Sequence, residues 1–449
     1  MFVISPNMVS LMLGWDGLGV VSFYLIGHYQ NFKSFNASMV TYLMNRIGDS
    51  FMLLLLFVLL SVNSWDFYFY SENLMNNMLM SLLLLLSVLT KSAQFPFSIW
   101  LSMAMAAPTP VSALVHSSTL VTAGVFLIIR FLNYLEDNIL KNFFYLFFFS
   151  LLYSSLSAWL EMDVKKVVAL STLSQLSMML LMLSMGYYLI SFIHLLIHAL
   201  FKSMIFMGVG LIIHDNFNKQ DFRLMGLYYY NCTFLMGLII VSLITLCGIP
   251  FLSLFYSKDF FLEMYMMNMY FNFYKLLMFY FSIFMTMIYC LRLFYYFYVS
   301  FKLNILMSFF KNHNFYLFSL FMLILFSGSA MFWIFDLNLN IIILNKMLKK
   351  IFFFFFFLSM FFFFFKFIYL MLLMSFFYLN MLLNFNLMYM KLFINFMFYV
   401  EKGWSEMVGG VVIYSTMKKL VVQYSYLHNS YIKLNLMFFI LIIMIFIFS

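Results

Sequence analysis

Long apolar stretches alternate with short polar interruptions along most of this chain. About twelve of these stretches reach the roughly 20 residues that a membrane-crossing helix needs. The first two run from about Asn7 to Gln30 and from about Met39 to Val62. The bilayer core offers no water to the backbone, so each stretch is expected to be an α-helix. The pattern therefore predicts an all-α membrane protein with about 12 transmembrane helices.

Two of these helices are predicted to be discontinuous. Of the chain's five prolines, Pro96, Pro108 and Pro110 follow Lys91, and Pro250 precedes Lys258. Proline lacks a backbone donor and breaks or kinks a helix. The two regions resemble each other, since each joins an apolar helix, a Phe-Pro-Phe or Ile-Pro-Phe triplet and a lysine. Paired interrupted helices of this kind are typical of inverted-repeat transporters, whose ion sites lie at the breaks.

The first break carries two candidate functional residues. Lys91 ends an uncharged run that begins at Leu74, and His116 lies in the apolar run after the double proline. A lysine at the bilayer centre costs roughly 2.5 to 3.5 kcal/mol on insertion scales, which argues for a role. A lone histidine on an apolar helix is usually a satisfied core residue. The position of His116 directly after a break favours a functional role instead.

A second constellation lies on one later helix. His194, His198 and Lys202 are spaced four residues apart and form a row that drifts about 40° per step. Histidine titrates near neutrality and can pass protons on, so the row is typical of a hydrated proton path. The alternative is three unrelated polar residues packed against neighbouring helices. No third type of metal ligand is close in sequence, so the row does not indicate a zinc site.

The sequence allows more than one role for several other charged residues. Asp16 lies about nine residues into the first apolar stretch, at mid-depth or near the membrane boundary. Arg46 and Asp49 share a helix face and can neutralise each other, which favours a structural role. Asp163 and Lys166 belong to a charged turn between two helices that is either simply solvated or functional.

Composition agrees with the membrane assignment and excludes several other classes. The chain is 66% hydrophobic and 9% charged, and its net charge of +9 suggests contact with anionic lipid and no nucleic acid. Cys232, Cys247 and Cys290 stand singly, so no zinc or iron–sulfur site is expected. No glycine-rich nucleotide loop occurs. The abundance of Phe and Met is typical of an A+T-rich genome that reads extra codons as Met, as animal mitochondria do.

Eight stretches of the chain are similar to one known family. They read WDGLG, NRIGD, KSAQFPF, PTPVSALVHSSTLVTAG, DVKKVVALSTLSQL, HLLIHALFKSMIFM, IIHDNFNKQDFR and GIPFLSLFYSKD. In this order they resemble the subunit 5 family of mitochondrial respiratory complex I, NADH:ubiquinone oxidoreductase. The sequences of the stretches look most like those of arthropod members of the family. The resemblance is dense from Ser5 to Asp259. Beyond that point it rests on the number of spans, a lateral stretch and a terminal anchor.

The resemblance implies a proton-translocating, antiporter-like subunit and a role for each matching residue. Asp16 matches the acidic residue that pairs with the central lysine, and Lys91 matches that lysine. The other path residues implied are His116 beside the first break, the central axis His194, His198 and Lys202, and Lys258 with Asp259 at the proton exit. Arg46, Asp49, Asp163, Lys166, Pro96, Pro108, Pro110 and Pro250 are expected to support the structure.

The resemblance also implies partners and location. The chain would act as a subunit of the proton-translocating reductase without redox chemistry or a cofactor or metal of its own. NADH, FMN, iron–sulfur clusters and ubiquinone would bind to other subunits. Partners would be other membrane-arm and supernumerary subunits, protons and lipids including cardiolipin, with no nucleic acid. The location would be the mitochondrial inner membrane, which the chain would cross many times.

Five segments are expected on the same basis. They are residues 1–141, an incomplete first antiporter-like half; 142–302, the second half; 303–383, additional membrane helices; 384–430, a lateral amphipathic segment; and 431–449, a terminal anchor helix.

The chain departs from the family at two points. By the resemblance, the sequence is expected to begin within the family's fifth helix, without roughly the first four helices of its inverted-repeat fold. Ser102 stands where proline is common in the family. Two other interpretations remain. One is a subunit of a multi-component cation/proton antiporter, which has the same broken helices and lysines. The other is a membrane scaffold whose charges are passive.

Overall fold

The computed structural model describes residues 2–60, 65, 78–215, 218–225, 233–249, 252–268, 273–298 and 418. The chain divides into two units, Met1–Asn380 and Met381–Ser449, and every described residue except Lys418 belongs to the first. The additional helices, lateral segment and terminal anchor expected at 303–383, 384–430 and 431–449 lie outside the described residues. The five segment boundaries therefore stay predictions.

The first unit is a bundle of helices. Its longer members are α1 (Met8–Ile26), α2 (Phe32–Leu60), α4 (Met78–Lys91), α7 (Leu120–Phe131), α8 (Asp137–Leu160), α9 (Val164–Ser184), α10 (Tyr188–Asp215), α12 (Thr233–Cys247), α13 (Ser253–Asn268) and α14 (Phe273–Tyr298). Seven helical segments of the described part are long and apolar enough to cross a membrane. The helical fold class predicted from the sequence is confirmed.

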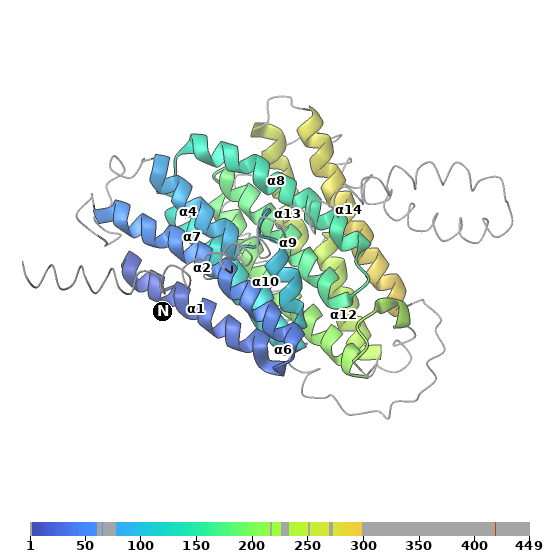
Figure 1. Ribbon diagram of the computed structural model, residues 1–449. Helices are drawn as coiled ribbons and strands as arrows, with labels where there is room; N and C mark the ends of the chain where they lie inside the picture. Colours follow the sequence, from blue (N-terminus) through green and yellow to red (C-terminus); the bar gives the residue numbers. More distant parts are fainter. Residues whose placement is uncertain are drawn as a thin grey trace, which may run out of the picture. The chain divides into compact units, whose positions relative to one another are not determined.

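Helices α9 and α10 form the middle of the bundle. Figure 1 shows them between α1 and α2 on one side and α12 and α14 on the other. Helix α9 packs against α7, α8, α10 and α14. Helix α9 is almost entirely buried, whereas α10 is buried over the larger part of its length. The polar residues Ser171, Gln175, His194, His198 and Lys202 of these two helices are buried.

Both predicted helix interruptions occur. Helix α4 ends at Lys91, and the chain then forms short elements before the next long helix. These are α5 (Ile99–Met103), η3 (Ala104–Ala106), α6 (Thr109–Ser112) and the π-helical turn η4 (Ala113–Thr119), which leads into α7. The second interruption separates α12 from α13, and Gly248 there adopts a φ of 80°. Pro250 lies outside the described residues.

The second apolar stretch begins earlier than predicted, at Phe32 instead of about Met39. The polar residues before Met39 form the start of helix α2. The Ser34 hydroxyl lies 3.0 Å from the Asn31 backbone nitrogen and donates to the Asn31 carbonyl at 2.9 Å. The Phe35 amide donates to the same carbonyl. Such reciprocal bonds satisfy backbone groups at a helix start, so the helix extends toward α1.

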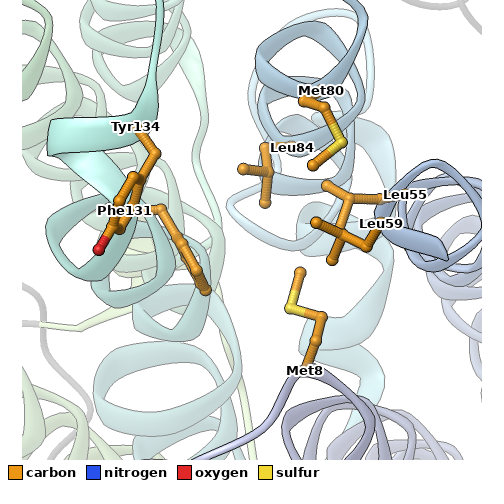
Figure 2. Close-up of a pocket in the computed structure, with 7 residues that line it drawn as sticks. All are labelled: Met8, Leu55, Leu59, Met80, Leu84, Phe131 and Tyr134. Atoms are coloured by element: carbon orange, nitrogen blue, oxygen red, sulfur yellow. The ribbon is translucent and has the colours of Figure 1, made fainter. Parts of the chain in front are cut away.

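A small apolar pocket lies among the ends of four helices. Its lining residues are Met8, Leu55, Leu59, Met80, Leu84, Phe131 and Tyr134. Figure 2 shows the Tyr134 hydroxyl pointing away from the other six side chains. The pocket therefore presents only hydrocarbon and thioether surface, which provides no polar group to orient a ligand.

Candidate functional site

Lys91 is held at the first break by a neighbouring helix. Its side chain is 1% exposed, and its Nζ donates to the main-chain carbonyl of Trp15 on α1 at 3.2 Å. The ammonium also lies 4.9 Å from the centroid of the Trp15 ring. Gly19 lies directly beside the ammonium, since a Cβ there would be in van der Waals contact with the Lys91 Nζ at 3.4 Å. The last residue of α4 is thus fixed against α1 by neutral groups.

Two carboxylates lie near Lys91, and both contact Arg46. The Arg46 Nη1 is 3.2 Å from the Asp49 Oδ2 and 3.8 Å from the Asp16 Oδ2. The predicted pairing of Arg46 with Asp49 is confirmed. Lys91 interacts electrostatically with Asp49 and, more weakly, with Asp16. Asp49 is buried, whereas the Asp16 side chain is 39% exposed.

The direct Asp16–Lys91 pair implied by the family resemblance is not present in this structure. The Asp16 carboxylate faces Arg46, and the Lys91 ammonium instead binds the carbonyl of the preceding residue, Trp15. The spacing of residues in the sequence does not predict which cation contacts Asp16, because Arg46 lies on a different helix, α2. The cluster therefore contains two carboxylates and two cations, with Lys91 as the member outside any ion pair.

The chain after Lys91 is stabilised by bonds that the proline pattern did not predict. Trp100 donates from Nε1 to the Thr90 carbonyl at 2.9 Å, which occupies an acceptor at the end of α4. Gln94 donates to the Ser92 carbonyl at 3.2 Å, and Ser150 on α8 donates to the Gln94 Oε1. All of these polar groups are buried. The break is therefore an ordered, hydrogen-bonded turn.

The double proline precedes an irregular helix that contains His116. Pro108 is the N-cap of α6, and Pro110 lies in its first turn, where a missing amide costs no helical bond. The π-helical turn η4 follows and packs against α9 and α10. π-Helical turns occur often at functional sites. The His116 side chain lies outside the described part of the chain, so its role stays a prediction.

The row on α10 is fully buried. His194, His198 and Lys202 are each 0% exposed. Lys202 donates to the Ser171 hydroxyl and lies 3.4 Å from the Val168 carbonyl, both on α9. The structure therefore places all three predicted residues in the protein interior.

The two histidines of this row have different surroundings. The His194 Nδ1 lies 2.8 Å from the Ser257 Oγ on α13, and its Nε2 lies 3.3 Å from the Gln175 Oε1 on α9. Neither ring nitrogen of His198 has a hydrogen-bond partner among the described residues. The Gln175 Nε2 and the Tyr289 hydroxyl on α14 are also buried without one. Unpaired buried polar atoms are costly and are commonly satisfied by internal water.

Lys258 repeats the arrangement of Lys91 at the second break. It is 1% exposed, and its Nζ donates to the carbonyl of Leu246, the second-last residue of α12. Each predicted lysine thus binds a main-chain carbonyl beside an interrupted helix. Asp259 is half-buried and interacts electrostatically with Tyr280 on α14.

The charged turn between α8 and α9 joins several elements. Lys166 pairs with Asp163 at 3.1 Å, and Asp163 forms an isolated bridge with Asp221. Arg292 on α14 donates to the Glu161 carbonyl at 2.7 Å. These contacts support the structural roles predicted for Asp163 and Lys166.

Two further groups near this turn refine the prediction. Lys165 is buried, not solvated, and donates to the Ala107 carbonyl of the first break at 3.1 Å. Arg223 lies in the short turn η6 (Phe222–Leu224), where hydrogen bonding with the Asp221 carboxylate raises the pKa of its guanidinium. Arg223 therefore stays charged at any physiological pH.

Sequence reasoning missed the polar residues that surround the predicted row. Ser171, Gln175 and Ser257 come from two helices, α9 and α13, and contact the α10 side chains. One signal was present for α9, where serine, threonine and glutamine recur within an apolar helix. No group of three or more His, Cys, Asp or Glu residues suited to a metal occurs among the described residues.

The polar row and its two flanking lysines lie within a segment that matches a known family. Residues 5–288 match the family described as NADH:quinone oxidoreductase/Mrp antiporter, TM. The chain belongs to this family. The match covers both helix breaks and every path residue predicted above.

Several relatives from insects share the name NADH-ubiquinone oxidoreductase chain 5. That of Aedes aegypti is 46% identical over 359 residues, which cover 78% of this chain and 62% of the relative. That of Anopheles gambiae is 50% identical over 300 residues, covering 66% and 52%. That of Locusta migratoria is 45% identical over 346 residues, covering 74% and 59%. The chain thus spans between 52% and 62% of the length of these three relatives.

Two solved structures share the fold. One is the Mrp complex from Dietzia sp. DQ12-45-1b, with a TM-score of 0.58 and 25% identity over 65% of this chain and 34% of that chain. The other is an archaeal membrane-bound sulfane sulfur reductase, with a TM-score of 0.64 over 73% of this chain and 70% of that chain. Its 19% identity supports the fold alone.

Proposed function

We propose that this chain is a core membrane subunit of respiratory NADH:ubiquinone oxidoreductase that moves protons across the mitochondrial inner membrane. The observation that carries the proposal is the burial of Lys91 and Lys258 at two similar helix breaks, with the fully buried row of α10 among the helices between them. The family match and the names of the insect relatives support the same assignment.

The free-energy cost of burying a lysine in a membrane favours a functional role for these three lysines. A cation at the centre of a bilayer costs roughly 2.5 to 3.5 kcal/mol on insertion scales. Lys91, Lys202 and Lys258 are all buried, yet none forms an ion pair in the described part of the chain. An ammonium bound to a carbonyl can release its proton without leaving a carboxylate unpaired. The three positions therefore suit groups that alternate between charged and neutral forms.

The proposed path uses side chains that already interact. Lys91 starts it beside Asp49 and Asp16. The turn that contains His116 packs against α10, where His198 interacts electrostatically with both Lys202 and His194. His194 interacts in turn with Lys258, which is followed by Asp259. The unpaired nitrogens of His198 provide bonding positions for the water that proton transfer requires.

The membrane potential acts on each proton that moves along this path. Moving one elementary charge across the membrane costs or yields about 2.3 kcal/mol per 100 mV. The chain itself needs no redox group for this task. NADH, FMN, iron–sulfur clusters and ubiquinone would bind to other subunits, and the partners would be those subunits and anionic lipids such as cardiolipin.

A lysine substitution tests the proposal. We expect Lys91→Met to lower the number of protons moved per NADH oxidised in membrane vesicles, because it removes the titratable group and preserves the volume. The matched control is Lys166→Met, since Lys166 is half-exposed and pairs with the turn residue Asp163. A Lys91→Met complex that assembles and moves the normal number of protons would overturn the proposal.

A cation/proton antiporter subunit is the second candidate. The likeness to the Mrp complex from Dietzia favours it, because that structure shares the fold at 25% identity. The antiporter interpretation requires sodium-dependent proton movement in vesicles without NADH. Proton movement that depends on NADH oxidation and is unaffected by sodium would exclude it.

A further inference from the structure

One asparagine of α2 lies inside the bundle without a hydrogen-bond partner. Asn45 is 1% exposed, and neither its Oδ1 nor its Nδ2 has a partner among the described residues. Buried polar atoms are rarely left unpaired in folded proteins, and internal water commonly satisfies those that are. Because this chain itself buries the amide, a small molecule can serve as its partner and a neighbouring protein cannot.

Asn45 lies beside the Lys91 ammonium. Helix α2, which carries Asn45, packs against both α1 and α4. A Cβ added at Gly19 on α1 would lie 3.4 Å from the Lys91 Nζ and 3.8 Å from the Asn45 Cβ. Among the described residues, no other atom outside α1 lies within 4 Å of that point. The ammonium and the asparagine therefore border one position beside α1 that has space for a further heavy atom.

Asp49 provides a third polar group on the same side of α2. It follows Asn45 by four residues, so the two side chains lie on one face of the helix. Its Oδ2 binds Arg46, whereas its Oδ1 is buried without a partner among the described residues. Asp49 also interacts electrostatically with Lys91. An amide, an ammonium and a carboxylate oxygen are thus gathered between α1, α2 and α4.

Water matches this set of groups better than an ion does. It accepts hydrogen bonds and donates them, so it can bind the ammonium, the amide and the carboxylate oxygen together. A metal cation would lie beside the positive charge of Lys91, and an anion would lie beside the negative charge of Asp49. A buried water needs about two to four polar partners, which these three side chains provide.

We propose that Asn45 is a positioning residue that holds a water molecule between Lys91 and Asp49. In this arrangement the Lys91 ammonium and the Asn45 amide donate to the water oxygen, and the water donates to the Asp49 Oδ1. Lys91 then passes a proton to the water while the water passes one of its own protons to the carboxylate. The ammonium becomes an amine, the carboxylate becomes a carboxylic acid, and the water is unchanged. The step rests on the proposed function, because that function makes Lys91 a group that releases protons.

A cryo-electron microscopy map of the assembled complex, at a resolution that shows ordered water, tests the binding site directly. We expect density within hydrogen-bond distance of the Asn45 amide, the Asp49 Oδ1 and the Lys91 Nζ, and no such density in Asn45→Leu. A native map without this density, or with the amide bonded to a protein atom, would overturn the proposal. Density that appears only when sodium is present would indicate a cation and would overturn it as well.

Variants of Asn45 test the proton step. Asn45→Leu keeps a branched side chain without polar atoms. We expect it to slow coupled NADH oxidation in sealed vesicles by about tenfold to 100-fold, because the proton is no longer held in line with its acceptor. The solvent deuterium isotope effect should rise, since proton transfer becomes rate-limiting. Asn45→Ser keeps a hydroxyl that can bind water and should restore most of the rate.

The matched control for these variants is Asn36→Leu, because Asn36 is exposed on the same helix. A native rate in Asn45→Leu, or a slow rate with the native isotope effect, would refute the role of Asn45. The proposed function is judged separately by Lys91→Met. If Lys91→Met lowers the number of protons moved per NADH oxidised and Asn45→Leu behaves like the native complex, only the relay through Asn45 is refuted.

Discussion

At the scale of single residues, all four lysines buried in the described part bind main-chain carbonyl groups. Lys91 binds Trp15, Lys165 binds Ala107, Lys202 approaches Val168, and Lys258 binds Leu246. A hydrogen bond to a charged group contributes about 1.5 to 3 kcal/mol. Breaking a buried ion pair costs about 3 to 5 kcal/mol, because the remaining charge is left uncompensated. Carbonyl partners therefore hold these cations in place at a lower cost of release.

The two carboxylates near Lys91 are expected to differ in importance. Asp49 is buried and interacts more strongly with Lys91 than the partly exposed Asp16 does. We predict that Asp49→Asn lowers proton translocation per NADH oxidised more than Asp16→Asn does. Vesicle assays of the two variants, normalised to the amount of assembled complex, measure the difference. A larger defect in Asp16→Asn would show that the direct pair implied by the family resemblance governs Lys91.

Ser257 orients a titratable side chain and can be tested beside a matched serine. Its hydroxyl is the partner of the His194 Nδ1 at 2.8 Å, so Ser257→Ala leaves that nitrogen buried and unpaired. The loss is expected to cost about 1 to 3 kcal/mol and to slow proton translocation. Ser282 on α14 is also buried, but among the described residues its hydroxyl bonds only to the Phe279 carbonyl of its own helix. Ser282→Ala should therefore leave the rate of proton translocation nearly unchanged in the same assay. Equal defects in both variants would contradict the role of Ser257.

At the scale of elements, the sequence predicted the helices and their interruptions well. Proline acts on its own helix, so Pro96, Pro108 and Pro110 indicate a break without any knowledge of the neighbours. The row on α10 was predictable for the same reason, since it depends only on spacing within one helix. Both features depend only on residues that are close together in the sequence, so the sequence alone is enough to predict them.

Contacts between helices were not predictable in the same way. Arg46 on α2 contacts Asp16 on α1, and Lys165 on α9 binds a carbonyl of the first break. Each contact depends on how two helices are rotated about their axes, which apolar stretches without a polar face do not specify. The family resemblance implied a role for each residue, including a direct Asp16–Lys91 pair. In the structure, Asp16 contacts Arg46 instead, and Lys91 binds the Trp15 carbonyl.

Close packing of α2 against α4 provides an element-scale prediction. A Cβ at Gly48 would collide with the Thr90 hydroxyl and lie 3.3 Å from the Thr90 Cβ. Gly48→Ala should separate the two helices beside Lys91, with a destabilisation of about 1 to 3 kcal/mol. Gly237 on α12 has no atom within 4 Å of an added Cβ, so Gly237→Ala is the control. The amount of assembled complex after mild heating measures both, and equal yields would show that α2 and α4 adjust without cost.

At the scale of the whole bundle, the two helix breaks lie on either side of α9 and α10. The elements of the first break contact these helices through α6 and η4, and α13 contacts α10 from the second. The side chains of Lys202, His198, His194 and Lys258 interact electrostatically as one connected group. This arrangement suits one path in series better than two separate channels.

A double substitution distinguishes a path in series from two channels. Lys91→Met and Lys258→Met are compared singly and together, with protons moved per NADH oxidised as the readout, so that differences in assembly cancel. Groups that act as one unit give strongly non-additive losses. We therefore expect each single substitution to lower the ratio by the same amount and the double substitution to lower it no further. A double variant that loses the sum of the two single losses would indicate two independent channels. An unchanged ratio in all three variants would support a passive scaffold, because a proton path cannot lose both lysines without effect.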